Sequence, residues 1–197
     1  FGADLPSSAR RIGVRGAALS FIDVCLLYGD TAETIYPVSR SGRFMEVKPS
    51  PETPLPEVSP RWRQACAHID NAAELREILI GAAGEFGDFS TAGLAAVIDG
   101  QDFTGDAVAE LEASLRAAEG SGSLTPAAAV GTAFRGVFQD CLDWHKAHGP
   151  MPGFRELSRT LERVAFGPPP VTARRLLELI HSGVVNTDYL GTPGPVS

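Results

Sequence analysis

Five prolines within residues 44–60 set the strongest limit on how this chain folds. They stand at positions 49, 51, 54, 56 and 60. Proline has no backbone N–H and a fixed φ angle, so such a stretch forms neither a regular helix nor a central strand. We therefore predict an extended connector here, or a loop that lines a channel, with residues 49–60 as its proline-rich part. We expect a β-α-β unit before this connector and a mostly helical region after it.

The segment before the prolines has the pattern of a β-α-β unit. Residues 11–16 read as a short apolar strand that ends in glycine, and residues 33–40 read as a second strand. Between them, residues 17–28 have the apolar spacing of a helix with a wide buried face. This length allows a right-handed crossover between parallel strands. We assign residues 1–48 to a Rossmann-like unit.

The remainder, residues 61–197, reads as helical, with a flexible break near residues 119–123 (Glu-Gly-Ser-Gly-Ser). Several predicted helices follow a serine or threonine suited to capping, or a proline suited to the first turn. The predicted fold class is α/β, a Rossmann-like βαβ unit followed by a mostly helical region. The predicted helices are 61–85, 91–98, 105–118, 126–147, 153–163 and 171–182.

The turn after the first strand partly matches a dinucleotide-binding fingerprint. Gly16 stands at the first glycine of G-x-G-x-x-G, but Ala18 and Phe21 stand at the second and third. In such a turn the start of the helix offers free N–H groups and a positive dipole to a pyrophosphate. Ala17 and Ser20 are the further residues of this turn that we expect to contact the pyrophosphate. From this motif alone, nucleotide binding and simple packing of the strand on the helix both remain open.

The end of the second strand offers a hydroxyl and two guanidinium groups. A dinucleotide fold that selects NAD places an acid here to hold the ribose 2′-hydroxyl, whereas a nearby arginine suits a 2′-phosphate. This chain has Ser39, Arg40 and Arg43 and no acid between them. The pattern favours NADP over NAD. The alternative is that these arginines are ordinary solvated surface residues.

These residues resemble a known group of proteins. "RIGVRGAALSFIDV" resembles the second nucleotide motif of bacterial FAD/NAD(P)-binding flavoproteins, which are similar to pyridine nucleotide-disulfide oxidoreductases and flavin monooxygenases. "YPVSRSGRF" resembles their S-R-x-G segment, and Asp23 matches an aspartate of their turn. Far along the chain, "VAFGPPPVTARRLLELIHSGVV" (164–185) resembles their Gly-Pro-Pro segment and the helix after it.

The resemblance implies a function for the chain. It would be the NAD(P)H-binding and helical portion of a cytoplasmic FAD-dependent oxidoreductase, in the manner of a monooxygenase, in which NADPH passes hydride to the flavin. FAD would be held mostly by sequence outside this chain or by a partner chain, so we expect the chain alone to be inactive. The alternative is a non-catalytic helical interaction module on a degenerate Rossmann scaffold.

Charge and composition argue against other classes of function. A net charge of −7 disfavours nucleic acid and anionic membranes as general partners, and no apolar run reaches the length of a membrane span. Three widely spaced cysteines predict reduced core residues and no zinc site. His145 and His148, three residues apart, are expected at a helix end, without a metal. The sequence identifies no catalytic residue.

Overall fold

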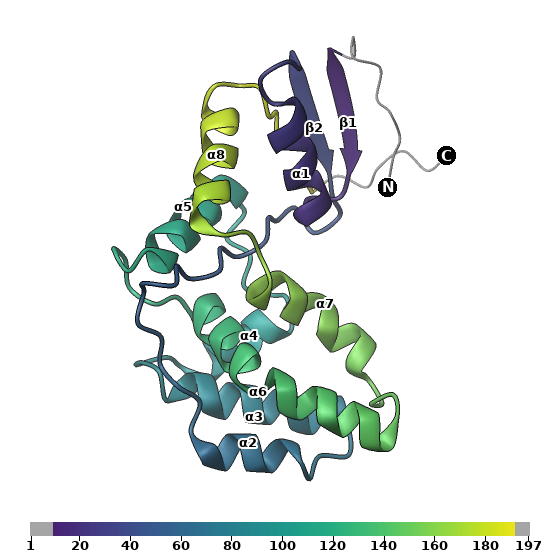
Figure 1. Ribbon diagram of the computed structural model, residues 1–197, viewed down its shortest axis with the longest axis vertical. Coiled ribbons are helices and arrows are strands. Elements are labelled where there is room, and N and C mark those ends of the chain that lie inside the picture. The colour runs from purple at the N-terminus through teal and green to yellow at the C-terminus, as the bar shows by residue number, and fades with distance from the viewer. Residues whose placement is uncertain (1–9, 192–197) are drawn as a thin grey trace.

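The structure is a computed structural model that describes residues 10–191, and it is mixed α/β but mostly helical. The strands lie at one end with α1 and α8 beside them, and the remaining helices extend away from them (Figure 1). The elements are β1 (Arg11–Arg15), α1 (Leu19–Tyr28), β2 (Thr34–Val38), α2 (Pro60–Cys66), α3 (Ala72–Gly84), α4 (Thr91–Ile98), α5 (Ala107–Ala118), α6 (Pro126–His148), α7 (Phe154–Ala165) and α8 (Pro170–His181).

The two strands are parallel, with Arg11 opposite Thr34 and Arg15 opposite Val38. A third segment, residues 184–191, runs parallel to β2 on its other side through two isolated bridges. Its carbonyl at Val184 accepts a hydrogen bond of 2.7 Å from the Ile35 N–H. The predicted parallel β-α-β unit is confirmed, while a full Rossmann sheet is not present within residues 10–191. The sequence reading missed the third segment.

One hydrophobic cluster, which we name the sheet cluster, joins the strands to three helices. It consists of the buried residues of β1, β2, α1, α5 and α8, together with Ala17, Phe44, Val47 and Val185. Strand residues alternate between two faces, and Ile12 and Ile35 lie on the buried one. Phe21 of α1 is 1% exposed and stacks on Phe44, with ring centroids 6.0 Å apart. Thus α5 and α8 pack on the β-α-β unit although they belong to the predicted helical region.

A second cluster, the helix cluster, is formed by α2, α3, α4, α6 and α7. Its centre is the long helix α6, where Val130 and Val137 are fully buried. Gly131 lets α7 approach the backbone of α6, because a Cβ at this position would overlap the carbonyl oxygen of Val164. The small residues at the start of α6 therefore determine how closely the two helices pack.

The prediction of one helix over residues 61–85 is wrong, because the chain breaks between α2 and α3. The Asn71 side chain caps α3 by accepting hydrogen bonds from the N–H groups of Ala73 (2.9 Å) and Glu74 (3.2 Å). The Glu74 carboxylate in turn accepts from the Asp70 N–H at 2.9 Å. This arrangement is a variant of the capping box in which the glutamate reaches the residue before the cap, and it starts a new helix inside the apolar pattern. The other predicted helices agree with α4 to α8 to within two residues at each end.

The connector forms neither helix nor strand over residues 44–59, as its prolines require. Its first part is buried between the two clusters. The Glu46 N–H donates to the Arg163 carbonyl, and the Lys48 N–H donates to the Pro168 carbonyl, each at 3.0 Å. Gly167 makes this contact possible, since a Cβ there would overlap the carbonyl oxygen of Glu46.

We expect Gly167→Ala to destabilise the protein, because the added methyl group must push the connector away from the segment before α8. Overpacking of this kind costs about 1–3 kcal/mol. Urea unfolding followed by circular dichroism measures the loss. Gly13→Ala is the matched control, because a Cβ at Gly13 meets no atom within 4 Å. Equal stability of the two variants would contradict the close approach at Gly167.

Candidate functional site

The turn after β1 lies beside the end of β2. Gly16 has φ +111°, a conformation that favours glycine, and its N–H donates to the Val38 carbonyl at 2.7 Å. Ala17 is buried at 6% exposure, and Ala18 is exposed. Because parallel strands end at the same edge of a sheet, this turn and the residues after Val38 share one edge. Ligands of open α/β folds bind at that edge.

The start of α1 has free hydrogen-bond donors. Ala18 is its N-cap residue, has no side chain that can cap, and is followed by no acid in the first turn. The Ala18 carbonyl accepts from the Phe21 and Ile22 N–H groups at 3.0 and 3.2 Å. The N–H groups of Leu19 and Ser20 have no partner in the part of the chain that the structure describes. A helix start in this state attracts an anion.

Ser39 and Arg40 lie at the same edge of the sheet, directly after β2. The Ser39 and Ser41 hydroxyl groups are 2.9 Å apart, and the Ser39 carbonyl accepts from the Gly191 N–H at 2.7 Å. Arg40 is exposed. The structure therefore brings the predicted residues of both motifs to one edge. We name this set the strand-end site: Gly16, Ala17, Ala18, Ser20, Ser39 and Arg40.

Arg43 does not join this site. It is 7% exposed, donates from Nε to Glu110 at 3.1 Å, and donates from both terminal nitrogens to Asp102, one of them at 2.9 Å. Burial acts to lower the pKa of Arg43, but the hydrogen bond and charge of Asp102 and the charge of Glu110 raise it overall. Its donors are committed to carboxylates within the protein. This corrects the expectation that Arg43 contacts a cofactor phosphate.

Arg15 is a residue that the sequence reading missed. It is exposed, stands at the end of β1 directly before Gly16, and lies opposite Val38. Its position at the end of a predicted strand could have identified it from the sequence. Arg15 and Arg40 thus place two exposed guanidinium groups at this edge of the sheet, in a chain of net charge −7. Positive charge of this kind favours an anionic ligand.

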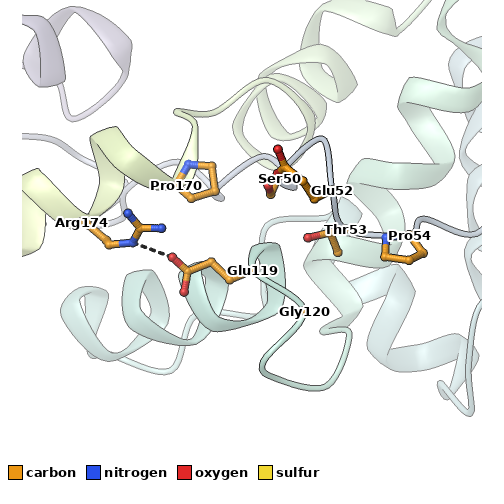
Figure 2. A pocket seen from close by; sticks show the side chains of 8 residues that line it. All are labelled: Ser50, Glu52, Thr53, Pro54, Glu119, Gly120, Pro170 and Arg174. Carbon is orange, nitrogen blue, oxygen red and sulfur yellow. Dashed lines mark hydrogen bonds and ion pairs between the residues drawn. The ribbon is translucent and has the colours of Figure 1, made fainter.

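A cavity of about 530 Å³ lies elsewhere, between the connector, the end of α5 and the start of α8 (Figure 2). Its charged residues are Glu52, Glu119 and Arg174, and the Arg174 Nε donates to Glu119 at 2.7 Å. Two carboxylates against one guanidinium disfavour a phosphate here. A second cavity, about 570 Å³, lies between α3, α4 and α7 in the helix cluster. Neither cavity includes a residue of the strand-end site.

The cysteines and histidines make structural contacts. Cys25, Cys66 and Cys141 are free and buried, as predicted, and burial raises the pKa of Cys25 to about 12. The Nδ1 atoms of His145 and His148 lie 3.0 Å from carbonyl oxygens of α6. Within residues 10–191, no group of three or more His, Cys, Asp or Glu side chains is arranged so that it could hold a metal ion. No helix in the same range is long and apolar enough to cross a membrane.

Comparison of the sequence with family models and with curated proteins finds no match. The function of the chain is therefore inferred from the geometry of the strand-end site.

We expect Arg43→Ala to destabilise the protein by about 3 kcal/mol, because it leaves the carboxylates of Asp102 and Glu110 poorly solvated and without their main partner. Arg40→Ala is the matched control and leaves the free energy of unfolding nearly unchanged, since Arg40 is exposed. Urea unfolding of both variants tests the assignment. If Arg43→Ala is as stable as Arg40→Ala, Arg43 is not a structural residue.

Proposed function

We propose that the strand-end site binds NADPH, and that this chain is the NAD(P)H-binding and helical portion of an FAD-dependent oxidoreductase. One observation carries the proposal. The N-terminus of α1 has no side-chain cap and no acid in its first turn, and it starts directly after a glycine turn at the edge where two parallel strands end. This is the arrangement that holds a pyrophosphate in dinucleotide-binding folds.

The pyrophosphate would accept hydrogen bonds from the Leu19 and Ser20 N–H groups and from the Ser20 hydroxyl. Ala18 replaces the glycine that usually lets the backbone approach the phosphate. Its φ of −95° and ψ of −164° are ordinary for alanine, so the turn forms without strain. The remaining effect of Ala18 is the volume of its methyl group, which limits how closely a phosphate approaches.

The ribose end of the cofactor would lie against Ser39 and Arg40. A guanidinium and a hydroxyl match a 2′-phosphate, and an acid that would repel it is missing between Val38 and Arg43. The exposed Arg15 adds positive charge at the same edge. These residues favour NADPH over NADH.

In this proposal the nicotinamide gives hydride to a flavin that is held mostly outside this chain, by further sequence or by a partner chain. The described residues supply cofactor binding, and none of them is assigned a catalytic role. A second candidate is a non-catalytic interaction module. The observation that favours it is the helix cluster, which has its own hydrophobic core and includes no residue of the strand-end site.

We expect the 197-residue chain to bind NADPH more tightly than NADH, and Arg40→Ala to weaken NADPH binding by roughly tenfold to a hundredfold. A hydrogen bond to a charged group is worth about 1.5–3 kcal/mol, and each 1.4 kcal/mol is a factor of about ten. Isothermal titration calorimetry measures both affinities. Arg159→Ala, a change at an exposed arginine on α7, is the control and should leave both unchanged. Equal NADPH affinity in the two variants would sink the assignment.

We expect Ala18→Gly to raise the affinity for both NADPH and NADH, because removing the methyl group lets the pyrophosphate approach the start of α1. The same titration measures the change. A gain for both cofactors separates this effect from that of Arg40, which discriminates between them. Tighter binding of neither cofactor would show that Ala18 does not limit a pyrophosphate contact and would favour the interaction module.

A further inference from the structure

Five charged residues meet between the sheet cluster and the helix cluster, and we name them the junction cluster: Arg43, Glu46, Asp102, Glu110 and Arg163. Arg43 directly precedes the connector and Glu46 lies in it, while Asp102 follows α4, Glu110 belongs to α5 and Arg163 belongs to α7. Arg43 pairs with Asp102 and Glu110, while Arg163 lies 3.6 Å from both Glu46 and Asp102. The side chains are only 6–18% exposed. Charges so poorly solvated must balance within the cluster.

The charges in the junction cluster do not balance if every group is ionised. Two guanidinium groups face three carboxylates, so one negative charge is left over in a poorly solvated space. The terminal nitrogens of Arg163 are buried and make no hydrogen bond to any of residues 10–191, so they act on the carboxylates through the ion pairs at 3.6 Å. A single proton on one carboxyl group would bring the cluster to neutrality.

Glu46 is the carboxyl group best placed to hold that proton. Glu110 accepts hydrogen bonds from Arg43 and from the Thr104 N–H (2.9 Å) and hydroxyl, and Asp102 accepts two from Arg43. These bonds stabilise their ionised forms. Glu46 is 8% exposed, and among residues 10–191 the groups that stabilise its ionised form are the Ser114 hydroxyl, the long ion pair to Arg163 and the charge of Arg43.

The pKa of Glu46 is raised, which favours the protonated carboxyl group. Burial raises it, and the neighbouring charge of Glu110 adds to the rise. The Ser114 hydroxyl and the charges of Arg163 and Arg43 oppose the rise without cancelling it.

We propose that the junction cluster is a proton-controlled contact between the two clusters of the fold. With a proton on Glu46, two guanidinium groups face two carboxylates and the connector is held between α5 and α7. Loss of the proton leaves an unbalanced buried charge at the point where the Glu46 and Val47 N–H groups bond to the Arg163 carbonyl and the Ser114 hydroxyl. The contact between the sheet cluster and the helix cluster then weakens.

The direction of the pH effect follows from linkage. The folded chain holds the Glu46 proton more tightly than the unfolded chain, in which this carboxyl has its ordinary pKa of 4.5. Folding therefore takes up a proton above pH 4.5. The stability that this proton contributes is complete below the unfolded pKa, and it is lost as pH rises through the higher folded value.

The test is urea unfolding of the 197-residue chain between about pH 5 and about pH 8. Glu46→Gln mimics the protonated side chain, so it should match the natural protein at the lower pH, exceed its stability at the higher pH, and lose its pH dependence. Glu57→Gln is the control, because Glu57 is an exposed residue of the same connector and should keep that dependence. Lower stability of Glu46→Gln at the higher pH would overturn the proposal, since it would mean that ionised Glu46 stabilises the junction.

If Glu46→Gln does not fold, carbon NMR of the Glu46 carboxyl group in the natural protein decides the question. A carboxyl signal of the protonated form at a pH above the ordinary glutamate pKa of 4.5 supports the proposal. Ionisation of Glu46 at that ordinary pKa overturns it. Amide exchange at Glu46 and Val47, corrected for the intrinsic rate, should lose protection over the pH range in which the Glu46 carboxyl ionises.

Discussion

Residues 44–48 are the constraint on which the rest of the structure depends, because this short extended segment lies against both hydrophobic clusters. It belongs to no helix or strand of the part of the chain that the structure describes, so its buried N–H groups must find acceptors in other elements. They find them at Arg163 in α7, at Pro168 before α8 and at Ser114 in α5. The position of the strand-end site relative to the helix cluster is therefore set by a few hydrogen bonds and by the ion pairs of the junction cluster.

The parts of the fold that could be predicted from the sequence are those decided by neighbouring residues. The prolines of the connector exclude regular structure by themselves, and the Thr125 cap with Pro126 after it starts α6 where expected. The break before α3 was missed because a short capping box interrupted an otherwise helical pattern. Residues 184–191 were missed because their pairing with β2 depends on a strand far away in the sequence, which no local pattern reveals.

The candidate site, too, has local features that could be predicted from the sequence and long-range features that could not. The turn at Gly16 and the strand end at Ser39 and Arg40 are local features, and the structure places both at one edge. Arg43 differs because an arginine just after a strand suits either a ligand or an internal carboxylate. Its partners Asp102 and Glu110 are distant in sequence, so only the tertiary structure decides between these roles. Nucleotide binding at the remaining residues stays a prediction that rests on donor geometry and on the exposed Arg15 and Arg40 at this edge.

The bridge between Ile35 and Val185 has a consequence for how the chain folds. The whole helix cluster lies between these residues in sequence, so closing the sheet requires a contact of long range, which forms slowly. During synthesis, β1, α1 and β2 leave the ribosome long before α8 and residues 184–191 do. The sheet cluster must wait for the last part of the chain, whereas the helix cluster contains only earlier residues and has local contacts. Folding is therefore expected to start in the helix cluster and to finish when residues 184–191 pair with β2.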